Sequence, residues 1–114
     1  MTDLIGSSVD APSTLADCAH AASRLLKLLA SEQRLLILCR LIDGESSVGA
    51  LADHVNLAQS ATSQHLAKMR AEGLVTTRRD GQTIFYRLAN PDAKRVLDTL
   101  FDIYRGRGAA VTAP

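Results

Sequence analysis

The chain has 114 residues, of which 46% are hydrophobic and 22% charged, with three prolines, seven glycines and a net charge of +1. These values are typical of one globular domain and exclude a fibrous repeat or a wholly disordered chain. There is no run of about 18 uncharged apolar residues that would predict a membrane-spanning helix. The first residues include Asp3 and Asp10 but no basic residue, so we expect no signal peptide, a cytoplasmic location and two reduced cysteines.

The small net charge conceals an uneven distribution of charge along the chain. Residues 1–58 carry a net charge of −3, residues 59–87 one of +3, and residues 88–114 one of +1. Positive charge in the middle third favours a local anionic partner, although such a cluster can also be an ordinary solvated surface.

The expected domain covers residues 13–106, between flexible tails at 1–12 and 107–114. Apolar residues at spacings of three and four predict a first helix. Its stripe consists of Leu15, Cys18, Ala22, Leu25, Leu26 and Leu29. Ser31 is the expected N-cap of a second helix, which should end at Asp43 and Gly44. The apolar stripe of this second helix consists of Leu35, Leu38, Cys39 and Ile42.

Two more helices are predicted in the centre of the chain. Ser46 or Ser47 can cap a short helix that ends at Asn56, a residue type that tolerates the left-handed conformation. Its apolar positions are Val48, Leu51, Ala52 and Val55. The next helix is predicted from Gln59 to Glu72 and ends at Gly73. Its apolar face is Thr62, Leu66 and Met69 with His65 beside it, and its other face is Gln59, Ser60, Ser63, Gln64, Ala67 and Lys68.

After Gly73 the chain is rich in β-branched and aromatic residues. Residues 74–79 and 83–88 predict two strands, and the Asp80-Gly81 pair between them indicates a type I′ hairpin turn. Asn90 and Pro91 should open a last helix as its N-cap and first residue. Its apolar stripe is Val96, Leu97, Leu100, Phe101 and Tyr104, and Gly106 should begin the tail. The fold class is mainly α with a small β-hairpin (α+β), in the element order of a winged helix-turn-helix.

The exposed face of helix 59–72 carries amides and hydroxyls where solvated helices usually carry charged residues. The side chains of Gln59, Ser60, Ser63 and Gln64 can donate to and accept from base edges in the major groove. Lys68, together with Arg78, Arg79 and Gln82 of the hairpin, can hold the DNA backbone or the minor groove. Since neighbouring strand residues face opposite sides, only one of the two arginines should point toward DNA. Each feature alone also fits an ordinary polar surface, but together they predict DNA binding.

Residues 25–89 resemble the ArsR family of small winged-helix repressors. The resemblance is most specific in the pattern SQHLxxMRxxGLVxxRRDGxxIFYxL, from Ser63 to Leu88. Within the family the chain is most similar to the nodulation-regulator type, and next to the sulfur-responsive type. The resemblance implies a homodimer, built on the first and last helices, that binds an inverted repeat in promoter DNA. One departure is Ala58, where relatives often have serine, so helix 59–72 should lack a side-chain N-cap.

The apolar stripes of the first and last helices argue for a dimer independently, because the remaining elements already supply a winged-helix core. The expected interface residues are Leu15, Cys18, Ala22, Leu97, Leu100, Phe101 and Tyr104. The alternative is that both stripes complete the core of the monomer.

No metal site or other cofactor is expected. Residues 45–51 lack the Cys-x-Cys pair of the family's arsenic and cadmium sensors, residues 91–105 contain no histidine, and His20, His54 and His65 are scattered. Cys39 matches the second-helix cysteine of persulfide-responsive members, whose partner cysteine is replaced by Arg105 in this chain. A thiol switch would therefore have to use Cys18 with Cys39. The alternative is that both are buried as small apolar residues.

Two other functional classes fit this sequence poorly. No nucleophile elbow, phosphate-binding loop, dinucleotide fingerprint or zinc-protease motif occurs, so no enzyme is predicted. The predicted hairpin, residues 74–88, is the wing of the fold. A winged helix used only for protein contacts should lose the basic residues of its wing, whereas this chain keeps Arg78 and Arg79.

Overall fold

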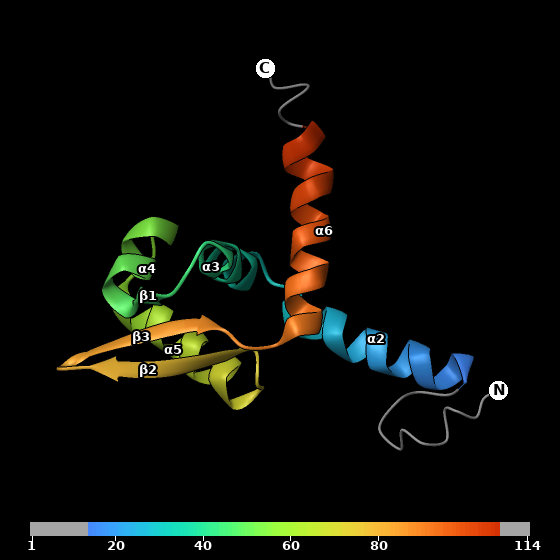
Figure 1. Cartoon of the computed structure of the whole chain (residues 1–114), viewed down its shortest axis with the longest axis horizontal. Coiled ribbons are helices and arrows are strands. Elements are labelled where there is room, and N and C mark those ends of the chain that lie inside the picture. The colour runs from blue at the N-terminus through green and yellow to red at the C-terminus, as the bar shows by residue number, and fades with distance from the viewer. Residues whose placement is uncertain (1–13, 108–114) are drawn as a thin grey trace. The chain divides into compact units, whose positions relative to one another are not determined.

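The computed structural model describes residues 14–107, which fall into two units that divide after Ser31 (Figure 1). The tail expected at 1–12 and nearly all of the tail expected at 107–114 lie outside the described residues. In the first unit, helix α2 (Leu15–Leu29) begins at Thr14, whose Oγ1 accepts a hydrogen bond from the Asp17 N–H at 3.0 Å. The predicted stripe of α2 is largely exposed, with Leu15 at 86%.

The second unit contains four helices and three strands. Its elements in chain order are α3 (Glu32–Ile42), β1 (Ser46–Ser47), α4 (Val48–Val55), α5 (Gln59–Ala71), β2 (Val75–Asp80), β3 (Thr83–Leu88) and α6 (Pro91–Arg107). The winged helix-turn-helix predicted from the sequence is confirmed. None of the described helices is long and apolar enough to cross a membrane.

The core of the second unit is formed by the inner faces of its helices and the start of the hairpin. Its most deeply buried large side chains are Ile37, Leu38, Leu51, Leu66, Met69, Leu74 and Leu97. The stripe predicted for α3 is partly wrong. Ile37, Leu38 and Leu41 form the buried face of that helix, while Leu35, Cys39 and Ile42 are only half-buried. The buried residues still form one helical stripe, but that stripe faces a different side of the helix from the predicted one, because the face is set by the packing of α3 against α4, β3 and α6.

The ends of the helices follow the local chemistry of their residues. Ser47 caps α4 by accepting a hydrogen bond from the Ala50 N–H at 3.2 Å, and Asn56 ends that helix in the left-handed conformation at φ 57°. Gly73, at φ 79°, turns the chain from α5 into the hairpin. Asn90 Oδ1 accepts hydrogen bonds from the N–H groups of residues 92 and 93, at 2.9 and 3.0 Å. The last helix continues through Gly106, beyond the predicted end.

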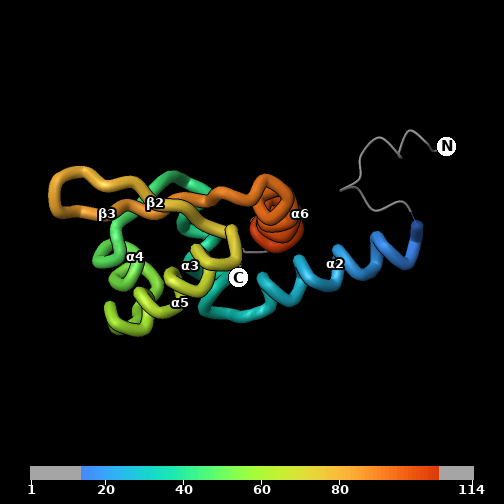
Figure 2. The backbone as a smooth tube through the Cα atoms, turned by 90° about the horizontal axis from the view of Figure 1, so that it is seen from below, coloured from blue at the N-terminus to red at the C-terminus, as the bar shows by residue number. Residues whose placement is uncertain are grey.

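The three strands form an antiparallel sheet in the order β1-β3-β2. β1 was not predicted, because Ser46 and Ser47 were expected only as caps. They also pair with Tyr86 and Phe85 of β3. The hairpin turn also differs, since the closing pair of residues 80 and 83 leaves a loop of Gly81 and residue 82. Only Gly81 has a positive φ, of 65°, which fits a type II′ turn rather than type I′. The tip of the hairpin projects past α4 and α5 (Figure 2).

Candidate nucleic-acid interface

Helix α5 has a buried face and a polar exposed face, as its sequence predicts. Thr62, Leu66 and Met69 are fully buried, and the Thr62 hydroxyl donates to the carbonyl of Ala58 at 3.0 Å. His65 is half-buried beside them. The exposed side chains are Gln59, Ser60, Ser63, Gln64, Ala67 and Lys68. Because the apolar face is fixed in the core, the amides and hydroxyls are held outward on a rigid helix.

The first turn of α5 has no side-chain cap. Ala58 occupies the N-cap position in an extended conformation, and no side-chain hydrogen bond satisfies the first N–H groups of the helix. This agrees with the expectation from the sequence. The positive end of the helix dipole and these N–H groups therefore lie beside Gln59 and Ser60, where an approaching anion would be stabilised.

The two neighbouring arginines of the wing have different environments. The Nε atom of Arg78 donates to both carboxylate oxygens of Glu45, at 2.8 and 2.9 Å, and its Nη2 also donates to Oε1 of the same residue. The Arg78 guanidinium lies 4.8 Å from the centre of the Phe85 ring. Arg78 is therefore already paired within the protein.

Arg79 lies on the opposite side of the strand, because successive strand residues alternate between faces. It is paired in register with Ile84 and is exposed, and it makes no ion pair within residues 14–107. Gln82 is exposed in the hairpin loop. Of the two wing arginines, Arg79 is the one whose charge is not already paired with a carboxylate of the described chain.

Glu45 is a residue of this site that the sequence analysis did not single out. It directly precedes β1, and its partner Arg78 is 33 residues away, so no local pattern indicates the contact. The hydrogen bonds from Arg78 lower the pKa of the Glu45 carboxyl below its ordinary value, despite some desolvation, and the charges of Arg78 and Arg87 act in the same direction.

Comparison with known proteins places this geometry in a family. The pattern of the bacterial regulatory proteins of the arsR family matches residues 31–77. The transcriptional activator HlyU of Vibrio cholerae is 50% identical over 70% of this chain and 74% of its own length. The nodulation protein NolR of Rhizobium meliloti is 50% identical over 75% of this chain and 70% of its own. A biofilm growth-associated repressor of Xylella fastidiosa is 38% identical over 75% of each chain.

This chain belongs to the ArsR family. It is a transcriptional regulator with a winged helix-turn-helix DNA-binding fold, as the sequence predicts.

Solved structures agree with this assignment. Reduced HlyU from Vibrio cholerae superposes with a TM-score of 0.74 at 46% identity, covering 79% of this chain and 95% of that one. A possible ArsR-family regulator from Mycobacterium bovis, described as a homodimeric winged helix-turn-helix DNA-binding domain, gives a TM-score of 0.67 at 30% identity. It covers 81% of this chain and 85% of that one.

The residues expected at a dimer interface differ in exposure in this ArsR-family chain. On α2, Leu15, Cys18 and Ala22 are exposed. On α6, Leu100 and Phe101 are half-buried and Tyr104 is 67% exposed. Leu97 is fully buried in the core of the second unit, so it belongs to the monomer interior rather than to an exposed stripe. The exposed stripe of α6 is instead extended by Ile103.

The two cysteines of this ArsR-family chain lie in different units. Cys18 is exposed on α2, contrary to the alternative in which both cysteines are buried. Cys39 is half-buried on α3, and burial raises the pKa of its thiol, while the positive charge of Arg105 on α6 acts in the opposite direction. Arg105 also lies over the Phe101 ring, 4.8 Å from its centre. Arg105 and Cys39 thus lie close enough to interact electrostatically.

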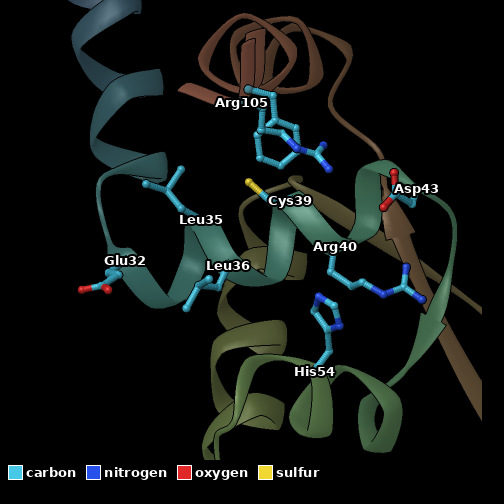
Figure 3. Close-up of a pocket in the computed structure, with 9 residues that line it drawn as sticks. Glu32, Leu35, Leu36, Cys39, Arg40, Asp43, His54 and Arg105 are labelled. Carbon is cyan, nitrogen blue, oxygen red and sulfur yellow. The ribbon is translucent and has the colours of Figure 1, made fainter. Parts of the chain in front are cut away.

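Cys39 lines a cavity of about 460 Å³ in the second unit (Figure 3). The lining residues are Glu32, Leu35, Leu36, Cys39, Arg40, Asp43, His54, Phe101 and Arg105. The wall mixes apolar side chains with side chains of both signs of charge. Within the described residues, no three His, Cys, Asp or Glu side chains gather in a way that could hold a metal ion.

Proposed function

We propose that this ArsR-family regulator is a homodimeric repressor that binds an inverted repeat in promoter DNA. The observation that carries the proposal is the exposed face of α5, which is built from amides and hydroxyls while the opposite face is fixed in the core. This is a binding function, and it assigns the protein no catalytic role and no cofactor.

In this proposal, α5 enters the major groove and contacts base edges. Gln59 and Ser60 lie in the first turn, the part of a recognition helix that usually contacts bases, and Ser63 and Gln64 follow one turn later. Glutamine can form two hydrogen bonds with adenine, and serine can donate or accept. The uncapped N–H groups of the helix and the Lys68 ammonium would contact phosphates.

The wing would contact the backbone or the minor groove next to the site. Its contacts come from Arg79 and Gln82, whose side chains are exposed. Arg78, which the sequence analysis also proposed for DNA binding, is engaged by Glu45, and we assign it no direct DNA contact.

Dimerisation would use the apolar stripes of α2 and α6, which are exposed on α2 and partly exposed on α6. Leu15, Cys18 and Ala22 supply the first, and Leu100, Phe101 and Tyr104 the second. Exposed apolar residues at helical spacing are costly in water unless a partner covers them. A two-fold dimer would place its two α5 helices about one turn of DNA apart, which matches an inverted repeat.

We assign repression rather than activation because this chain is similar to relatives that are named repressors, although one relative is named an activator. A promoter-binding role would place the protein in the cytoplasm. Control by Cys18 and Cys39 is not part of the proposal, because the raised pKa of Cys39 leaves less of the reactive thiolate at neutral pH.

The experiment is a fluorescence anisotropy titration of the reduced protein on DNA from upstream of its own gene. A random duplex of equal length and charge serves as the control. We expect binding at least about a thousandfold tighter to the cognate duplex at physiological salt. Footprinting should then show two half-sites about 10 base pairs apart or a multiple of it. If selection from randomised DNA also yields no preferred sequence, the proposal is wrong.

A further inference from the structure

One contact of the second unit crosses the whole sheet. The sheet order is β1-β3-β2, and Arg78 belongs to β2 while Glu45 directly precedes β1. To reach Glu45, the Arg78 side chain passes over the Phe85 ring of the middle strand β3. The Arg78–Glu45 contact is therefore a cross-sheet ion pair, which connects the two edges of the sheet on one face.

The cross-sheet ion pair lies where the sheet changes from three strands to two. Phe85 of β3 is opposite both Ser47 of β1 and Arg78 of β2. Beyond this position the hairpin continues toward its tip without a third strand, through the pairs formed by residues 79–80 and 83–84. Two-stranded ribbons twist more freely than larger sheets and are marginally stable alone. The direction of the tip therefore depends on how firmly its base is held.

Glu45, the acidic partner of the cross-sheet ion pair, is connected to the helix-turn-helix. Glu45 is followed by β1, and Ser47 is both the last residue of β1 and the N-cap of α4. The cross-sheet ion pair therefore joins the base of the wing to the start of α4, and α4 packs directly against α5. The ion pair thus adds a second link between α5 and the wing, beside the direct packing of α5 against β2.

The pair has the geometry of a positioning contact. The fork of an arginine holds a carboxylate at two points and fixes its direction, while stacking on an aromatic ring restricts the guanidinium further. The two side chains are 50% and 30% exposed, and pairs this exposed contribute little to overall stability. Its main effect is thus on where the wing lies.

From this geometry we infer that Glu45 is a positioning residue for DNA binding. It holds Arg78 across the sheet and thereby directs the wing tip, with Arg79, toward the DNA. The inference rests on the proposed function. It also makes an unusual prediction, because removing a negative charge near DNA ordinarily strengthens binding. Here the removal of Glu45 should weaken it.

The test compares Kd values for the cognate duplex. We expect Glu45→Gln to weaken binding about fivefold with an unchanged melting temperature, since a charge-assisted hydrogen-bond pair is lost. The matched control is Asp80→Asn, which removes the same charge nearer the hairpin tip, where Asp80 approaches Arg78 only at 3.9 Å. This control should bind as tightly as the wild type or tighter.

A second arm separates positioning from a general structural effect. If Glu45 acts through Arg79, the Glu45→Gln change should cause little further loss in an Arg79→Ala background. The inference is overturned if Glu45→Gln leaves binding unchanged or tightens it, or if its full effect persists without Arg79. A wild-type protein that binds cognate and random DNA alike would instead contradict the proposed function, and the inference with it.

Discussion

The guanidinium of Arg34 holds the carboxylate of Glu72 at two points, with Nη1 2.8 Å from Oε1 and Nη2 3.3 Å from Oε2. Arg34 lies in the first turn of α3, and Glu72 is the C-cap of α5. The Arg34 side chain is only 13% exposed and that of Glu72 35%. This pair therefore fixes the end of the proposed recognition helix to the helix that contributes Ile37 and Leu38 to the core.

We expect Glu72→Gln to lower the free energy of unfolding by about 1–2 kcal/mol, because the charge-assisted contact between the largely buried Arg34 side chain and the Glu72 carboxylate is lost. Urea denaturation monitored by circular dichroism measures this change. The control is Asp98→Asn, which breaks the Lys94–Asp98 pair of 2.8 Å between two half-exposed side chains. That loss should be below about 0.5 kcal/mol. Equal effects for the two variants would contradict the special role of the Arg34 contact.

Gln59→Ala tests base recognition by α5. We expect a loss of about 1–3 kcal/mol in binding the cognate duplex and a relaxed preference at one base pair, because a pair of base hydrogen bonds disappears. Anisotropy on cognate, single-mismatch and random duplexes measures both effects. Gln33→Ala, at an exposed glutamine of α3, is the matched control and should change neither. The same loss on random DNA as on the cognate site would remove Gln59 from base recognition.

Arg79→Ala tests the wing. Since a phosphate contact carries no sequence information, we expect cognate and random DNA to be weakened alike. The slope of log affinity against log salt should fall by about one, as one counterion fewer is released. The control is Arg95→Ala, which removes an 84% exposed arginine from α6 and should leave the slope unchanged. An unchanged slope for Arg79→Ala would exclude a phosphate contact at that residue.

Tyr104→Asp tests the proposed dimer. Tyr104 is the most exposed large apolar residue described on α6, and a carboxylate buried in an interface lacks a partner. We expect the dimer dissociation constant to rise by at least about tenfold, with the helix content retained. Sedimentation velocity over a range of concentrations measures this constant. Thr99→Asp adds the same charge at another exposed position of α6 and serves as the control. A dimer unaffected by Tyr104→Asp would place the interface elsewhere.

The pH dependence of Cys39 alkylation tests its environment. In a Cys18→Ser background, we expect iodoacetamide to react with an apparent pKa above the ordinary thiol value, because burial disfavours the thiolate. Arg105→Gln should raise this pKa further, since a nearby positive charge is lost. The raised pKa also means that stability present at neutral pH is lost as the pH rises through the folded-state value. A pKa below the ordinary value would show an activated cysteine and reopen thiol control.

The sequence determined the helices and the hairpin of this protein and the chemistry of its proposed DNA surface. Local signals were sufficient for this, because a cap such as Asn90 acts within one helical turn, and a glycine such as Gly73 acts through its own backbone angles. The polar face of α5 could also be predicted, since helical periodicity assigns each residue to a face. The strand β1 and the buried face of α3 could not, because both depend on which distant segments pack against them.

Only the tertiary structure decided between the two wing arginines. Arg78 and Arg79 are the same residue type at adjacent positions. Strand alternation indicates that their side chains point to opposite faces of the sheet, but not which of them has a carboxylate partner. The answer depends on Glu45, which the fold brings next to Arg78 from 33 residues away. The same holds for Leu97, which is part of a periodic stripe in the sequence but lies wholly in the core. Long-range packing places charges and apolar faces against particular partners, and periodicity alone contains no information about those partners.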